Sequence, residues 1–265
     1  MLKNKLKLKV LLFLLQFTII CNGHSNPYSK LFNIEDYDIS DLKFELIIKD
    51  LKKHLVNYYP LKNLNNFKIN IYWLKNGKLD IVLEGFPPGK KHVENEIKLR
   101  ALNKIRVFFP KDEIKSLSAF YNIKKENKKI TATNPEKQLR KVIFDLGSKG
   151  LISKISTYYP LNRVTKEIFY KLGENNKYRI SETKEYNSSY KNNFLKNEIF
   201  TYEKVSKYLM PVKIETIETI KISNSKPNMP KEKRTFKSEV SFLNFKINNG
   251  LSKKYFNKEN GKKNE

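Results

Sequence analysis

The sequence predicts an α+β fold that is mainly antiparallel β-structure, and three observations carry this prediction. Eight segments after residue 128 alternate apolar and polar residues, which is the period of a strand with one buried face. Polar turns such as "GSKG" and "GENN" separate them, which favours an antiparallel meander over βαβ units. No Pro/Ser-rich linker divides the series, so one domain is expected. The segments are 129–133, 141–146, 151–158, 164–172, 177–185, 197–202, 212–222 and 236–247.

A β-hairpin is expected at 67–83. Asn-Gly in "KNGK" at 75–78 suits a type I′ turn, whose two central residues both need positive φ. Apolar residues alternate with polar ones on both sides of this turn: Phe67, Ile69, Ile71 and Trp73 before it, and Leu79, Ile81 and Leu83 after it.

Three helices are predicted. The first begins after Ser40, which can cap it, and ends near Tyr58, before Pro60. A second is expected at 93–105, and "KDEIKSLSAFY" at 111–121 reads as a third, short helix. The apolar stripes that predict the first two recur at three- and four-residue spacing: Phe44, Ile47, Ile48, Leu51, Leu55 and Tyr58, and then Val93, Ile97 and Ala101, with Leu102 and Ile105 beside them.

The N-terminus reads as a secretory signal peptide over 1–23. Four lysines precede an apolar run at 10–20, which is too short to span a bilayer, since that needs roughly 20 apolar residues. Cleavage after Gly23 places small residues, Cys21 and Gly23, at the positions that the peptidase requires. The remaining chain divides into a polar lead (24–40), a single β-rich domain (41–251) and a basic, flexible tail (252–265). The mature protein is expected to be periplasmic or secreted.

Cys21, the only cysteine, leaves a second localisation open. In a bacterial lipoprotein signal this residue would be acylated and would tether the protein to a membrane. Such signals usually have a small residue just before the cysteine and Leu three before it, whereas Ile20 and Thr18 stand here. Cleavage is therefore favoured. It leaves a chain without cysteine, which must depend on its core for stability.

The chain is strongly basic, with 53 Lys and Arg against 27 Asp and Glu and a net charge of +26. This surplus attracts polyanions, including an anionic membrane surface. Lys, Asn and Ile dominate together, however, as they do in chains from AT-rich genomes. The basic residues are also spread evenly, without the Arg clusters or aromatic motif of a nucleic-acid module, so nucleic acid is not expected as a partner.

The sequence predicts no enzymatic activity, no metal site and no cofactor. It has three histidines, none with a partner at metal-ligand or general-base spacing, and it lacks a Gly-x-Ser-x-Gly elbow, a phosphate loop and a dinucleotide fingerprint. Asp80 and Glu84 would share one strand face, and Glu215 lies near Glu218. Such carboxylate pairs arise freely among 27 acidic residues, so a solvated strand face is the preferred interpretation.

Apolar side chains on one side of the predicted strands are candidates for lining a cavity. The alternative is an ordinary core against a helix. A sheet of this size has more apolar face than two helices can cover, so it either closes into a barrel or curls and leaves a cavity for an apolar ligand. The candidates are Phe67, Ile69, Ile71, Trp73, Ile81, Phe144, Leu146, Val240 and Phe242.

From 42 to 251 the order of segments resembles the LolA-like lipoprotein-carrier superfamily. The segments concerned are an opening helix, the hairpin "IYWLKNGKLDIVLEGFP", mid-chain helices, and the final runs "IFTYEKVSKYLMPVKIETIETI" and "FKSEVSFLNFKINNGL". "KVIFDLGSKGLISKI" at 141–155 looks like a hairpin of that family, and the runs at 202–214 and 245–248 are similar to its last strands. An exported β-rich repeat protein from an AT-rich apicomplexan genome would share the composition and signal, but gives no reason for the "YLMP" segment.

The resemblance implies an incomplete antiparallel β-barrel of about eleven strands, with helices lidding its concave apolar face. Members of the superfamily bind acyl chains of lipoproteins or other lipids. We therefore expect an exported, monomeric, non-enzymatic binder or carrier of lipid or acylated protein. The alternative is an exported surface or interaction protein, with a packed β core and a basic face that binds a partner or polyanion. Salt distinguishes the two, because polyanion binding weakens steeply as ionic strength rises.

Overall fold

The computed structural model describes residues 30–75, 77–109, 122–134, 141–159, 162–189, 192–222 and 232–262. Three α-helices and four 3-10 helices lie within these ranges: α2 (Leu51–Leu55), α3 (Lys91–Ile105), α5 (Leu251–Lys262), η1 (Ile34–Asp36), η2 (Leu61–Leu64), η3 (Arg106–Phe108) and η4 (Glu174–Asn176). The same ranges hold twelve strands: β1 (Asp41–Ile48), β2 (Lys68–Leu74), β3 (Leu79–Glu84), β4 (Asn122–Glu126), β5 (Lys129–Thr133), β6 (Lys141–Leu146), β7 (Ile152–Tyr158), β8 (Asn162–Leu172), β9 (Tyr178–Ser189), β10 (Asn192–Val205), β11 (Tyr208–Ile222) and β12 (Glu232–Ile247).

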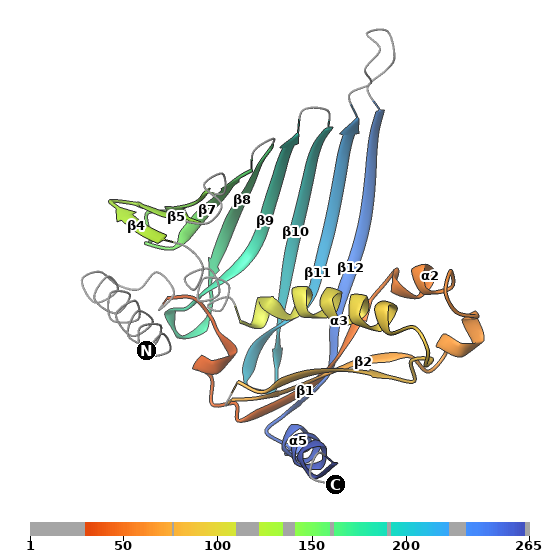
Figure 1. Ribbon diagram of the computed structural model, residues 1–265. Helices are drawn as coiled ribbons and strands as arrows, with labels where there is room; N and C mark the ends of the chain where they lie inside the picture. The colour runs from red at the N-terminus through yellow and green to blue at the C-terminus, as the bar shows by residue number, and fades with distance from the viewer. Residues whose placement is uncertain are drawn as a thin grey trace, which may run out of the picture.

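All twelve described strands belong to one antiparallel sheet, in the order β3-β2-β1-β12-β11-β10-β9-β8-β7-β6-β5-β4. From β4 to β12 each strand pairs with the next along the chain, so this part is a meander. The chain's first strand, β1, pairs with its last, β12, and the β2–β3 hairpin extends the sheet beyond β1. Figure 1 shows the long strands β8–β12 rising behind α3.

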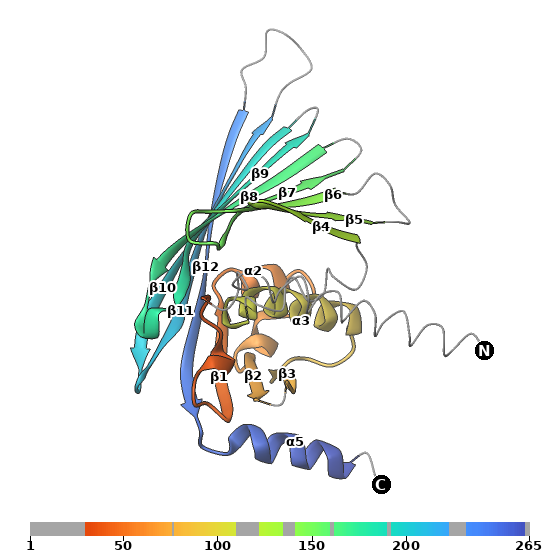
Figure 2. The same ribbon diagram turned by 90° about the vertical axis from the view of Figure 1, so that its left-hand side faces the viewer.

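The predicted fold class is confirmed. The sheet does not close, since β3 and β4 remain its two edges, and few helices accompany it. Figure 2 shows the sheet curving around α2 and α3, which lie on its concave side, while α5 lies below β1. The molecule is therefore an incomplete barrel with helices against its inner face.

The main hydrophobic core lies between α3, η3 and strands β1, β2 and β12. Phe108 stacks on Phe44 at 4.9 Å between ring centroids and meets Phe242 edge-on at 5.1 Å. The stripe predicted for α3 is buried, with Val93, Ile97, Ala101 and Ile105 at 2% exposure or less. A second, smaller cluster lies between β5, β6 and β7. Its buried members are Ala132, Val142, Phe144 and Ile152.

A β-bulge in β12 turns an additional aromatic ring into the main core. Asn244 and Phe245 stand opposite the single residue Phe44 of β1, and Asn244 has φ of 54°. Because successive strand residues alternate between faces, the extra residue lets both Phe242 and Phe245 point inward. Phe245 then stacks on Phe44 at 5.4 Å. Asn tolerates the left-handed conformation that this bulge requires.

The predicted helix over 41–58 is wrong for its first half. Residues 41–48 form β1, where Leu42, Phe44 and Leu46 are buried at alternate positions, and only Leu51–Leu55 is helical. The apolar residues of this stretch match both the helical and the strand period. Pairing with β2 and β12 on both sides stabilises the strand.

The remaining local predictions have mixed outcomes. The 67–83 hairpin, the helix at 93–105 and all eight strand segments are confirmed, whereas β4 was not anticipated. Part of the lead predicted to be polar contributes Phe32, Ile34 and Ile39 to the main core. The predicted basic tail forms α5, where Tyr255 stacks on Tyr72 at 4.3 Å. The signal segment 1–23 and the predicted helix 111–121 lie outside the described residues.

A buried arginine anchors the segment that precedes β1, which contains Phe32 and Tyr37, to the sheet. Arg179 of β9 is 4% exposed, donates a hydrogen bond to the Tyr37 hydroxyl at 2.7 Å and lies over the ring of Phe32. Gly173 makes room for it, because a Cβ there would lie 1.3 Å from the Arg179 Nη1. Burial raises the pKa of the nearby Tyr202 phenol, which the charge of Arg179 partly opposes.

The bulge predicts a difference between two substitutions at Asn244. Both Asn244→Gly and Asn244→Val lose the side-chain hydrogen bond to Glu45. Only valine adds the penalty for a branched side chain at positive φ, so it should lower the free energy of unfolding by about 1–2 kcal/mol more than glycine. Urea denaturation measures the difference. Equal values for the two variants would contradict the bulge.

Candidate functional site

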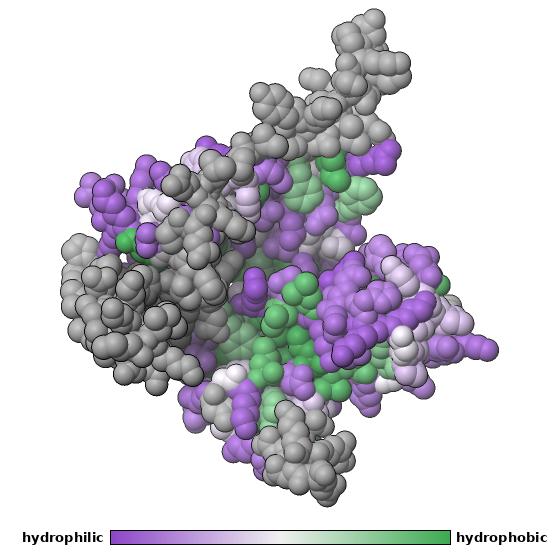
Figure 3. All heavy atoms as spheres, viewed as in Figure 1, coloured by the Kyte–Doolittle hydropathy of each residue, from purple (hydrophilic) through white to green (hydrophobic). Residues whose placement is uncertain are grey.

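A large cleft lies between the helices and the concave face of the sheet. Its volume is about 1060 Å³, and its walls come from α2, α3 and η3 on one side and from β8–β12 on the other. Figure 3 shows the molecule hollowed beside α3, with apolar surface at the base of the hollow. We call this space the main cleft.

Strand register arranges the inner face of β8–β12 in successive rows. The apolar row, closest to the core, contains Phe200, Ile214 and Val240. The Glu198 row follows, with Thr183, Glu198, Thr216 and Ser238 on neighbouring strands. The charged row comes next and contains Lys166, Glu185, Lys196, Glu218 and Phe236. The main cleft therefore passes from an apolar base to a wall of alternating charges.

An ion triad at Glu198 connects α3 to the sheet across the main cleft. The Lys104 and Lys196 ammonium groups contact the same carboxylate oxygen, Oε1 of Glu198, at 3.0 and 2.9 Å. The Thr183 hydroxyl donates to the other oxygen, Oε2, at 3.3 Å. Lys104 lies in the last turn of α3, where a cation also interacts favourably with the helix dipole.

Glu198 remains ionised over the physiological pH range. Burial alone would raise the pKa of its carboxyl, but the attraction and hydrogen bonds of Lys104 and Lys196 outweigh burial and lower the pKa to about 2. A carboxyl with a lowered folded-state pKa stabilises the fold above its unfolded-state value. This contribution is lost only as pH falls toward about 2.

The main cleft is amphipathic and cationic. Its described lining contains seven apolar residues, among them Phe200, together with seven Lys or Arg and four Asp or Glu residues. One of the seven basic residues, Lys237, lies between the inward-facing Phe236 and Ser238, so its side chain faces the outer side of the sheet. Several charges are already paired outside the triad: Lys53 with Asp50 at 3.3 Å, and Arg100 with Glu96 at 2.5 Å. Such a lining suits a ligand that has both an apolar part and a polar or anionic part.

The sequence-predicted cavity residues lie elsewhere. Seven of the nine are buried in the main core: Phe67, Ile69, Ile71, Trp73, Ile81, Val240 and Phe242. Phe144 is buried in the second cluster, and Leu146 packs against it. The described lining of the main cleft includes none of the nine, so their contact with a ligand stays a sequence prediction.

Sequence reasoning missed the residues that do line the main cleft. Apolar alternation identifies buried faces, whereas the wall of this cleft is formed largely by charged side chains. Lys104 and Glu198 are 94 residues apart in the chain and meet only through the tertiary fold. The one local signal was the alternation of Lys196, Glu198 and Phe200 on a single strand face.

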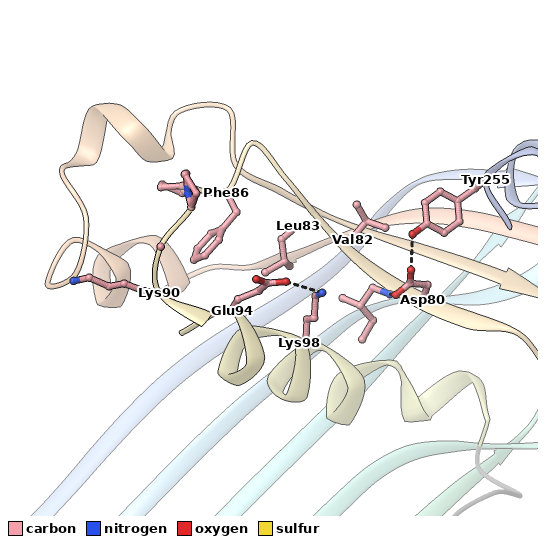
Figure 4. Close-up of a pocket in the computed structure, with 12 residues that line it drawn as sticks. Asp80, Val82, Leu83, Phe86, Lys90, Glu94, Lys98 and Tyr255 are labelled. Carbon is pink, nitrogen blue, oxygen red and sulfur yellow. Dashed lines mark hydrogen bonds and ion pairs between the residues drawn. The ribbon is translucent and has the colours of Figure 1, made fainter. Parts of the chain in front are cut away.

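A smaller pocket of about 270 Å³ lies between edge strand β3, α3 and α5 (Figure 4). Its polar groups satisfy one another: Asp80 accepts hydrogen bonds from the Ile81 N–H at 2.7 Å and from the Tyr255 hydroxyl at 2.5 Å, and Lys98 pairs with Glu94. Glu84 accepts instead from the Asn70 amide. Asp80 and Glu84 thus have separate structural partners, and this pocket is the weaker candidate.

Two features are absent from the described residues. No group of three His, Cys, Asp or Glu side chains there could hold a metal ion. In the same part of the chain, no helix combines the length and the apolar character needed to cross a membrane.

Comparisons with family models, with curated proteins and with solved structures find no match for this chain. The resemblance to the LolA-like superfamily therefore stays a prediction.

The location of Trp73 predicts a large effect on stability. Trp73 is 2% exposed in the main core, so Trp73→Ala should lower the free energy of unfolding by about 3–5 kcal/mol. Phe236, which lines the main cleft, is 52% exposed, and Phe236→Ala should change it by about 0.5 kcal/mol or less. Urea denaturation compares the two variants. An unchanged stability for Trp73→Ala would place this ring outside the core.

Proposed function

We propose that this protein is an exported, non-enzymatic binder or carrier of a lipid or an acylated protein, and that the main cleft holds the ligand. The observation that carries the proposal is the cleft of about 1060 Å³ between α3 and the inner face of the open sheet. Pockets for small ligands commonly have volumes of about 300–1,000 Å³ and mostly apolar walls with a few placed polar groups. The main cleft is large enough for such a ligand.

Binding in this cleft needs no covalent chemistry. Each methylene group that leaves water contributes about 0.8 kcal/mol, and Ile48, Phe200 and Phe236, which line the main cleft and are not fully buried, offer apolar contacts. The buried stripe of α3 holds this helix against the core. Ligand exchange would therefore proceed through the open side of the cleft, with local adjustment at Lys104, and not by displacement of the whole helix.

Export and the superfamily are part of the same proposal. The lysine-rich start and the apolar run before Gly23 support secretion, with Cys21 as a membrane tether in the alternative case. A helix-covered, unclosed antiparallel sheet is compatible with a LolA-like carrier. Lys53, whose side chain is exposed where α2 borders the main cleft, would approach an anionic membrane surface during transfer.

The outer face of the sheet offers less support for a polyanion-binding protein. Lys184 pairs there with Glu182 at 3.4 Å, and Lys213 pairs with Glu215 at 3.4 Å. Paired charges of this kind lower the local surplus of positive charge that binding of a polyanion would need.

Lipid retention tests the proposal. Native mass spectrometry of the purified protein, followed by organic extraction, should detect a bound lipid. Phe236→Asp puts a carboxylate into the main cleft and should reduce the retained lipid by about tenfold or more. Phe169→Asp is the matched control, because Phe169 is similarly exposed on the outer face, beside Lys184, and should leave retention unchanged.

Two results would argue against lipid carriage. An absence of lipid from wild-type protein, including protein incubated with lipid vesicles, would remove the basis for the proposal. A bound species lost steeply between low and moderate salt would instead indicate a polyanion, since lipid retention should change little with ionic strength.

A further inference from the structure

We infer that the main cleft selects a ligand with an anionic head group, which binds between Lys104 and Lys196 beside Glu198. This inference rests on the proposed function. It specifies the ligand as an amphiphile, either a single-chain one or a lipid, whose polar end is a carboxylate or a phosphate. The chain would lie against the partly exposed side of Phe200, and the head group would lie at the charged row.

The two lysines keep unused hydrogen-bond donors. Each ammonium group carries three N–H donors, and each contacts Oε1 of Glu198 with one of them. Their side chains are 23% and 25% exposed, while Glu198 is only 14% exposed. An incoming anion can therefore reach both ammonium groups from the cleft side without displacing Glu198.

The local charge also favours an anion. Two ammonium groups share one carboxylate, so the triad carries a net positive charge. In the described part of the chain, Arg106 and Lys166 line the same cleft and make no ion pair. Glu185 and Glu218 flank Lys196 in the charged row and reduce the positive charge there. Without the outward-facing Lys237, the described lining still has six basic residues against four acidic ones.

The rows explain why the ligand must be an amphiphile as well as an anion. Phe200 and Ile214 lie on one side of the Glu198 row, and the charged row lies on the other. A free inorganic anion would leave the partly exposed ring of Phe200 in contact with water. A neutral chain would bury apolar surface but leave the Lys104 and Lys196 donors without a new acceptor.

Titration calorimetry with twelve-carbon amphiphiles, below the concentrations at which they form micelles, tests this specificity. Dodecanoate and dodecyl phosphate should bind the full chain at least about tenfold more tightly than dodecanol, because a charge-assisted hydrogen bond contributes at least that factor. Dodecyltrimethylammonium should bind more weakly still. The two anions together distinguish a carboxylate from a phosphate head group.

Two lysine variants separate a specific site from general charge attraction. Lys196 and Lys184 lie on neighbouring strands, each pairs with a glutamate two residues away, and they are 25% and 35% exposed, but they face opposite sides of the sheet. Lys196→Met should weaken dodecanoate binding about tenfold, while Lys184→Met, which removes the same charge, should change it less than about twofold. Circular dichroism and thermal melting check that both variants fold.

Glu198→Gln supplies a gain-of-binding test. Glutamine keeps the shape of the side chain but removes the charge that competes for the two lysines. Dodecanoate affinity should therefore rise by about threefold or more, while thermal stability falls. A purely structural triad would show the loss of stability without the gain in affinity.

The outcomes distinguish this inference from the proposed function. Equal affinity for dodecanoate and dodecanol, or equal losses in Lys196→Met and Lys184→Met, would overturn the anionic head-group site and leave lipid binding intact. Failure of all four amphiphiles to bind, with no lipid retained from vesicles, would overturn the proposed function itself.

Discussion

The pairing of β1 with β12 is the interaction on which the rest of the structure depends. It joins the N-terminal hairpin unit to the meander, and it places Leu46 beside Phe242 at the centre of the main core. Side-chain hydrogen bonds hold the same junction: Asn248 Oδ1 accepts from the Ser40 N–H at 2.6 Å, and Ser252 donates to the Leu42 carbonyl at 2.7 Å. These partners are about 210 residues apart, so the core can form only after the chain is nearly complete, which is the condition for slow folding.

This junction also determines where the helices lie. Because β1 and β3 occupy one end of the sheet, α2 and α3, which follow them, cover the concave side of β10–β12 and leave part of the inner face uncovered. The rows on that face change from apolar to charged with distance from the junction. Residues near it, such as Ile214, contribute to the core, whereas Lys196, further along the same face, lies in the wall of the main cleft. One strand register therefore produces both the stable region and the cleft.

The sequence predicted the parts of this structure that depend on local pattern. The Asn-Gly hairpin and the α3 stripe were recognisable because turn chemistry and apolar spacing agree there. The β1 segment was misassigned because Phe44, Ile48, Leu51 and Leu55 fit a helical period. Only the distant partners β2 and β12 decide that it is a strand. The cleft was harder still to predict from the sequence, because Glu198, Lys104 and Thr183 come from three elements and no local pattern brings them together.

The electrostatics of Glu198 limit how the helix and the sheet can separate. Its carboxyl has a pKa of about 2, so no pH change within the physiological range would neutralise it and weaken its contact with Lys104. The Lys104 ammonium has donors left over, and the competing partner that could draw it away from Glu198 must itself be an acceptor. An anionic ligand group can use these remaining donors while the contact between Lys104 and Glu198 is kept. Lys104 would then connect α3 to Glu198 when the cleft is empty and, together with Lys196, would also hold the ligand when it is filled.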